Sequence, residues 1–234
     1  MPTPAPYVPS YRALRQTPGG IYYLHDYIPM HRVAGYSYED YKQSVDIIAY
    51  KDCSAKAVYI FSLEFCLALA ALAESIPQTQ MWLFAVPPSK VHKFSPVRMS
   101  ITNICGLYTT GIIASALGCN KAFLNYSHAI ERTKDITTNH HGKRDAYATQ
   151  MSSLSLYLPD TAPTPGTTAL DAEFTASIPG TPEKNVFSPD AALIILDDLT
   201  TTGTSMDVCR DLLVNAGATP ENIYRMVLAR TLWF

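Results

Sequence analysis

The chain has 234 residues, of which 47% are apolar and 16% charged, so it is long and apolar enough to bury one substantial core. The formal net charge of −2 gives no broad electrostatic reason to bind nucleic acid, although local basic patches stay open. The five cysteines are odd in number and form no Cys-x-x-Cys pair, which argues against a disulfide scaffold or structural zinc and favours a reducing cytoplasm.

The N-terminal segment has no basic region followed by an apolar stretch, so it is not expected to be a secretory signal. Residues 1–20 are proline-rich and are expected to form a flexible arm, while residues 21–234 form one domain. Residues 57–73 are apolar and long enough to approach a membrane span, but Glu64 lies at the middle of the segment. A buried helix is therefore expected there, and no membrane contact.

Strand-like and helix-like segments alternate over the first half of the domain. Apolar periodicity, turn residues and a helix-start pattern at residues 37–40 set their limits. The pattern predicts strands at 21–27, 81–86 and 121–125, and helices from 37 to about 50, from 54 to about 76, and over 97–117. Such alternation indicates the α/β class, a parallel sheet flanked by helices.

Two long segments, residues 131–150 and 158–189, show no regular pattern. The first is rich in charge and histidine, and the second is dominated by Pro, Thr, Gly and Ala. Irregular stretches of this length in a small domain are usually functional flaps or insertions. Residues 158–189 are expected to be a mobile insertion.

The most informative segment begins at Ala191, where an apolar strand of the kind buried on both faces of a parallel sheet breaks into two acids, Asp197 and Asp198. Adjacent carboxylates at the end of a buried strand are costly unless a cation or hydroxyl donors meet them. A loop of hydroxyl residues and one glycine follows, and then an amphipathic helix that ends near Gly217. The loop consists of Thr200, Thr201, Thr202, Gly203, Thr204 and Ser205. A helix N-terminus behind such a loop can bind a phosphate.

A simpler interpretation is an ordinary strand-to-helix turn in which Asp198 or a threonine caps the helix. A cap accounts for one polar residue, whereas this segment carries two acids and several hydroxyl residues. A P-loop does not fit, since no Gly-x-x-x-x-Gly-Lys-Ser/Thr occurs, and a dinucleotide-binding Gly-x-Gly-x-x-Gly is missing as well.

The segment Asp197-Asp-Leu-Thr-Thr-Thr-Gly-Thr-Ser205 resembles the signature of the type I phosphoribosyltransferases. The resemblance is specific over residues 191–231 and loose over 40–157, and it is nearest to ComF-like and amidophosphoribosyltransferase-type domains. It implies that Asp197 and Asp198 bind the ribose hydroxyls of phosphoribosyl pyrophosphate and that residues 200–205 hold its 5′-phosphate. Thr200 departs slightly from the family pattern, in which an aliphatic residue is common.

The same resemblance assigns the pyrophosphate leaving group to a loop after an early strand, where Pro88, Ser89 and Lys90 stand here. Lys90 would neutralise the anion with help from His92 or Lys93, although a solvated lysine in a Pro-Pro-Ser turn is common in any protein. Type I enzymes also carry a flexible loop with basic residues that closes over pyrophosphate. The candidates for that loop are Arg132, Lys134, Lys143 and Arg144, each of which also fits a merely solvated charge.

The function implied is that of a pentosyltransferase, which passes the phosphoribosyl group to a nitrogenous base or amine. The resemblance also implies Mg²⁺ held mainly through the substrate, with Asp197 and Asp198 as its ligands from the protein, and a small hood over residues 21–50. Homodimers are common in the family. Two alternatives stay open: a non-catalytic regulator that binds phosphoribosyl pyrophosphate, and a ComF-like protein of DNA uptake. The acceptor is not legible from the sequence.

Overall fold

The computed structural model describes residues 14–29, 36–111, 118–136, 147–159, 174–176 and 187–232. Its main sheet has the strand order β1-β2-β9-β8-β3-β4, and every neighbouring pair is parallel except β1 and β2. The strands are β1 (Arg15–Gln16), β2 (Ile21–Tyr27), β3 (Gln80–Ala85), β4 (Ala122–Asn125), β8 (Ala191–Thr200) and β9 (Ile223–Thr231). The α/β class with a mostly parallel sheet is confirmed.

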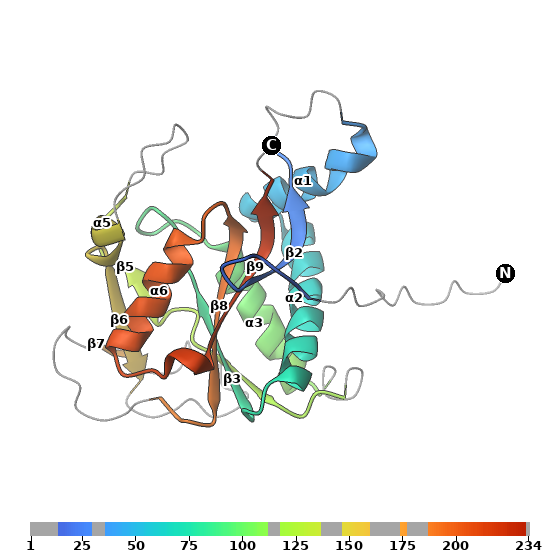
Figure 1. The fold of residues 1–234 in the computed structure, drawn as a ribbon. Coiled ribbons are helices and arrows are strands. Elements are labelled where there is room, and N and C mark those ends of the chain that lie inside the picture. The colour runs from blue at the N-terminus through green and yellow to red at the C-terminus, as the bar shows by residue number, and fades with distance from the viewer. Residues whose placement is uncertain are drawn as a thin grey trace.

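Helices cover one face of the sheet, and a helix with a second, small sheet covers the other (Figure 1). The first layer holds α1 (Tyr38–Lys51), α2 (Ala55–Ser75) and α3 (Pro96–Thr109). The second layer holds α6 (Thr204–Asn215) and the antiparallel strands β5 (Ile130–Arg132), β6 (Leu154–Pro159) and β7 (Phe174–Ala176). The short helix α5 (Tyr147–Met151) precedes β6, and a 3₁₀ turn, η3 (Pro220–Asn222), leads into β9.

Strand β8 is the centre of the core because its side chains alternate between two hydrophobic clusters. Ala192, Ile194 and Leu196 pack with α2 and α3, whereas Leu193 and Ile195 pack with α6 and the second sheet. All five are buried. The continuous apolar run therefore reflects a strand covered on both faces, as expected from the sequence.

Helix α2 contains the apolar segment that the sequence singles out. Among the described residues it is the one helix long and apolar enough to cross a membrane, and most of its apolar stretch is buried within the protein. Glu64 at its middle pairs with His25 of β2. Helix α2 is thus a buried helix in the first layer, as predicted.

Several boundaries expected from the sequence are wrong. Residues 15–20 are not part of a flexible arm, because β1 pairs with β2 and a turn joins them. Residues 21–27 are not part of a hood, because β2 lies in the main sheet beside β9. The third helix ends at Thr109 rather than 117, since Gly111 takes a left-handed conformation (φ 73°) that stops it. Residues 1–13 and 112–117 lie outside the described part.

The two segments expected to be irregular contain secondary structure. Within 131–150 the structure has the end of β5 and the start of α5. Within 158–189, β6 ends and β7 pairs with it, and Phe187 packs near Trp82. Strands β5 and β7 are too short to show an alternation of apolar and polar residues in the sequence. They are strands because they pair with β6 in an antiparallel ladder.

Candidate functional site

The two acids lie where β8 separates from one of its neighbours. The β3–β8 ladder ends at Ala85 and Leu196, with a last hydrogen bond from the Val86 amide to the Leu196 carbonyl at 2.9 Å. On its other side β8 stays paired with β9 as far as Thr200. Asp197 and Asp198 therefore stand beside the loop that follows β3, at the carboxyl edge of a parallel sheet, where ligands bind in open α/β folds.

The carboxylates differ in their surroundings. The Asp197 side chain accepts a hydrogen bond from the Asp198 amide at 2.8 Å, yet burial and the neighbouring Asp198 charge raise its pKa well above the ordinary value. Asp198 pairs with Lys51 from the end of α1, with Nζ and Oδ2 3.9 Å apart. Asp197 is thus held at an electrostatic cost, whereas Asp198 has a cation nearby. The cost at Asp197 falls when hydroxyl donors or a cation bind.

The loop after the acids needs glycine at position 203, directly before α6. Gly203 has φ 81°, and a Cβ added there would lie 2.6 Å from Ile21 Cδ1. No side chain caps the N-terminus of α6 within the described residues, so its first amide groups are available for an anion. Thr201 and Thr202 are exposed, while Thr200 is buried at the end of β8. The hydroxyl of Ser205 donates to Gln150 Oε1 at 3.2 Å.

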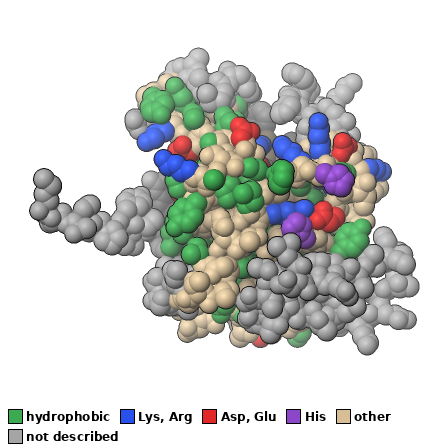
Figure 2. All heavy atoms as spheres, turned by 180° about the vertical axis from the view of Figure 1, so that it is seen from behind, with side chains coloured by type: hydrophobic (Ala, Val, Ile, Leu, Met, Phe, Trp, Pro, Cys, Tyr) green, Lys and Arg blue, Asp and Glu red, His purple; other side chains and the backbone are tan. Residues whose placement is uncertain are grey.

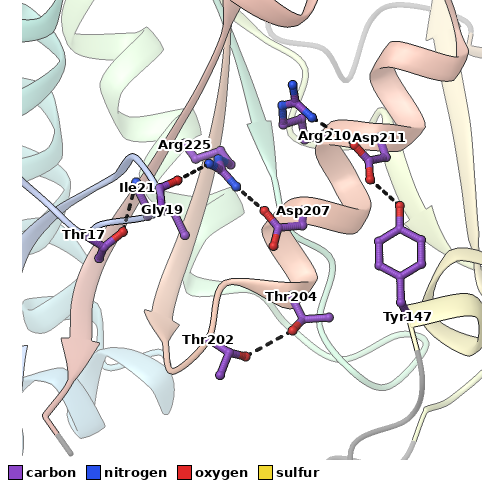
Figure 3. A network of polar contacts seen from close by, with 10 residues as sticks. All are labelled: Thr17, Gly19, Ile21, Tyr147, Thr202, Thr204, Asp207, Arg210, Asp211 and Arg225. Carbon is purple, nitrogen blue, oxygen red and sulfur yellow. Dashed lines mark hydrogen bonds and ion pairs between the residues drawn. The ribbon is translucent and has the colours of Figure 1, made fainter.

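Contacts on two sides hold α6 behind this loop (Figure 3). On one side Asp207 pairs with Arg225, which also donates to the Gly19 carbonyl. On the other side the Tyr147 hydroxyl of α5 donates to Asp211. At the tip, the hydroxyl oxygens of Thr202 and Thr204 lie 3.1 Å apart. Helix α6 is therefore anchored to both the main sheet and the α5 segment.

The loop after β3 is tied to the segment around β5. Arg132 Nε donates to the Pro88 carbonyl at 2.7 Å, the Ile136 amide donates to the Ser89 carbonyl at 2.9 Å, and the Val91 amide donates to Asp135 Oδ1 at 2.7 Å. The sequence places these residues in two distant loops, and the structure brings them together. Arg132 is buried, and its Nη1 also donates to Ser153 Oγ at 2.5 Å.

A cavity of about 330 Å³ lies between these two segments. We call it the basic cavity, because its charged lining comprises four Lys or Arg side chains and one acid, with a histidine in addition. Its lining residues are Pro87, Pro88, Lys90, Val91, His92, Lys93, Arg98, Glu131 and Arg132. Figure 2 shows basic and histidine side chains gathered on the face turned away from the view of Figure 1. Such a lining favours a polyanion.

Arg98 and Glu131 of this lining were not predicted from the sequence. Arg98 Nη2 contacts Glu131 at 3.0 Å, and His128 Nδ1 lies 3.3 Å from the same carboxylate. Burial acts to raise the pKa of Glu131, but the hydrogen bonds and charges of His128 and Arg98 outweigh it, so the pKa lies below the ordinary value. The acid is therefore ionised at neutral pH and holds Arg98 at the cavity.

The other basic residues predicted from the sequence lie in different places. Lys90 lines the basic cavity. Lys134 does not line it, and its ammonium contacts Ser152 Oγ at 3.2 Å. Lys143 and Arg144 lie outside the described residues. Lys51 contacts Asp198 and Gln150 contacts Ser205, although neither was predicted to belong to the site. Both residues come from elements distant in the chain, so nothing in their local sequence identifies them as site residues.

The twin acids are the carboxylates that the end of β8 offers to a metal ion. Within the described residues no group of three His, Cys, Asp or Glu side chains is placed to hold a metal ion. Asp197 and Asp198 fit Mg²⁺ only where a ligand supplies most of its oxygens, since Mg²⁺ commonly binds proteins through one or two carboxylates together with substrate phosphates. Comparison with protein families, curated proteins and solved structures finds no match to this chain.

Proposed function

We propose that the chain is a type I phosphoribosyltransferase-like enzyme of the cytoplasm, which binds phosphoribosyl pyrophosphate and transfers its phosphoribosyl group to a nitrogenous acceptor. The observation that carries the proposal is the order of groups along one edge of the sheet. An uncapped helix N-terminus with hydroxyls, a pair of acids and a basic cavity follow one another there. These groups match in turn a phosphate, a pair of ribose hydroxyls and a pyrophosphate.

The protein's part in the reaction is positioning and charge stabilisation. Residues 201–205 and the α6 amides hold the 5′-phosphate, and the two aspartates accept hydrogen bonds from the ribose hydroxyls. The C1–O bond to pyrophosphate breaks and its electron pair leaves with that group, towards Lys90 and Arg98. The acceptor nitrogen supplies the pair for the new C1–N bond, and any proton on that nitrogen passes to water. Bound Mg²⁺ would neutralise charge on the pyrophosphate, with Asp197 and Asp198 as its ligands from the protein.

The test measures pyrophosphate release and ligand binding separately. Purified protein is given phosphoribosyl pyrophosphate, Mg²⁺ and a panel of bases and amines, and binding of ribose 5-phosphate is measured by calorimetry. Asp198→Asn removes a charged hydrogen-bond acceptor, so we expect ribose 5-phosphate to bind between about 10-fold and 150-fold more weakly. Glu221→Gln is the matched control, because it removes one exposed carboxylate before the start of β9, at the amino edge of the sheet.

Three outcomes are informative. Pyrophosphate release that depends on an acceptor and is lost in Asp198→Asn supports the enzyme. Binding of phosphoribosyl pyrophosphate without turnover by any acceptor supports the regulatory alternative instead. Failure of ribose 5-phosphate to bind at millimolar concentration, with the protein folded, overturns the proposal.

A further inference from the structure

Helix α2 leaves an apolar strip uncovered on the side that faces away from the core. Tyr59, Ile60 and Leu63 are 57%, 42% and 36% exposed, and the half-buried Leu67 and Ala71 continue the row along the helix. Their spacing places them on one face over about three helical turns. We call these five residues the α2 strip. Single exposed apolar residues are common, whereas a row of them along one helix indicates a contact surface.

An exposed charge stands at each end of the α2 strip, and the two charges have opposite signs. Lys56 is the second residue of α2, and Glu74 is the last but one. Both are exposed, and neither has an ion-pair partner within the ranges that the structure describes. The acid at the middle of the helix, Glu64, already pairs with His25. The two end charges are therefore available to a partner.

The α2 strip and its end charges have the same spacing when read in either direction. Lys56 lies seven residues before Leu63, and Glu74 lies seven residues after Leu67. Leu63 and Leu67 are themselves four residues apart. Steps of four and seven keep side chains on one face of a helix, so these four residues form one line that is symmetric about the midpoint between Leu63 and Leu67.

This symmetry fits a second copy of α2 turned end for end. Leu67 of one copy then faces Leu63 of the other, and Glu74 faces Lys56. Ile60 and Ala71 lie five residues before and six residues after the same midpoint, so a large side chain faces a small one and the helices can approach closely. Two parallel copies would instead place Lys56 against Lys56 and Glu74 against Glu74, which is unfavourable.

A membrane surface fits the α2 strip less well than a second copy does. Helices that lie on membranes carry several lysines or arginines beside their apolar face, which pair with anionic lipids. The exposed charges on this side of α2 are one lysine and one glutamate, and they cancel. Balanced charges at the two ends of an apolar row are instead typical of helices that pair with each other.

We propose that the α2 strip binds the same strip of a second copy of this chain, as an antiparallel pair of helices related by a two-fold axis between Leu63 and Leu67. A two-fold interface is self-complementary, so every contact occurs twice. Removal of the apolar side chains from water drives the association. The two Lys56–Glu74 pairs fix the direction of the helices more than they add affinity. The inference is independent of the proposed phosphoribosyl transfer.

Sedimentation equilibrium of the full chain measures the dissociation constant of the dimer. Leu63→Glu places a carboxylate against the partner's Leu67, twice in each dimer, so we expect the dissociation constant to rise at least about 100-fold. Val45→Glu is the matched control, because Val45 of α1 is 38% exposed and the change adds the same charge outside the α2 strip. It should leave the dimer intact.

Reversal of the end charges tests the direction of the helices. Lys56→Glu and Glu74→Lys each place like charges at both ends of the antiparallel pair, so at low salt we expect each variant alone to dimerise about tenfold more weakly. An equimolar mixture of the two variants restores opposite charges at both ends and should dimerise as tightly as the wild type. In a parallel pair neither single change would weaken the dimer.

Three results would overturn the inference. One is a wild-type chain that stays monomeric at about 100 μM, and another is a dimer that Leu63→Glu leaves unchanged. The third is a monomer that binds vesicles of phosphatidylcholine and phosphatidylglycerol through the same residues, which would assign the α2 strip to a membrane. Circular dichroism checks that each variant is folded. If Leu63→Glu is not, the mixture of charge-reversed variants decides, because it alters only exposed side chains.

Discussion

The acid–threonine segment (residues 197–205) and the basic cavity are built in opposite ways. The segment is continuous in sequence, from the end of β8 to the first turn of α6, and its polar groups are neighbours because they are consecutive. The basic cavity is assembled from the loop after β3, the first turn of α3 and the strand β5. Backbone conformation therefore holds the acid–threonine segment in shape, whereas side-chain contacts between distant segments hold the basic cavity. Substitutions that disturb one of these should leave the other intact.

The largest effect is expected at the glycine of the acid–threonine segment. Gly203→Ala places a Cβ in a left-handed conformation and against Ile21, so we expect the free energy of unfolding to fall by about 2–5 kcal/mol. Urea unfolding measures this. Gly106→Ala is the control, because Gly106 lies within α3 and an added Cβ would have no described atom within 4 Å beyond its chain neighbours and the backbone of its own helix, so alanine there should stabilise by about 0.5–1 kcal/mol. Equal effects of both changes would contradict the backbone argument.

The next effect tests the contacts that assemble the basic cavity. Arg132→Met leaves the Pro88 carbonyl and the Ser153 hydroxyl without their buried donor, so we expect a loss of about 1–3 kcal/mol in unfolding free energy. We also expect the loop after β3 to exchange its amide hydrogens faster, which hydrogen exchange would detect. Lys134→Met removes a neighbouring exposed cation, whose hydrogen-bond partner among the described residues is Ser152, and should do neither. Unchanged exchange in Arg132→Met would show that the loop is held by other contacts.

The same contrast explains what the sequence could predict. The strand, the acids and the start of α6 were predicted because local pattern and spacing are sufficient for consecutive residues. Arg98, Glu131 and Lys51 were not, since a lone charged residue on a helix or strand looks solvated until its neighbours in space are known. The hood was misplaced for a related reason: the sequence shows that 21–27 is a strand, but not that its partner is β9.

A third substitution should stabilise the fold while removing function. The folded-state pKa of Asp197 is raised, so the fold favours its protonated carboxyl group: this stability is fully present below the ordinary pKa of aspartate and is lost as the pH rises through the raised value. Asp197→Asn should then raise the unfolding free energy at neutral pH by about 0.5–2 kcal/mol, yet weaken binding of ribose 5-phosphate. Thermal unfolding at two pH values measures the first effect and calorimetry the second.

The matched substitution for this prediction is Asp198→Asn. Asp198 has Lys51 beside it, so its removal loses a favourable pair and should bring no comparable gain. A melting temperature that is equal or lower for Asp197→Asn at neutral pH would contradict the view that the site stores an electrostatic cost.

The smallest effect belongs to Glu131 at the basic cavity, and its sign is opposite. The folded-state pKa of Glu131 is lowered, so its carboxylate adds stability above the ordinary pKa of glutamate, and this is lost as the pH falls through the lowered value. The side chain is 36% exposed, so screening limits the contribution. Glu131→Gln should lower the unfolding free energy at neutral pH by less than about 1 kcal/mol.

Urea unfolding from neutral to acidic pH distinguishes this contribution from a general loss of packing. The difference between wild type and Glu131→Gln should shrink as the pH falls, because the wild-type carboxylate becomes protonated and then resembles the amide. A difference that stays constant with pH would mean that Glu131 acts through its shape rather than its charge. In that case the charge of Glu131 would contribute nothing to the free energy of unfolding, whereas the charge of Asp197 lowers it.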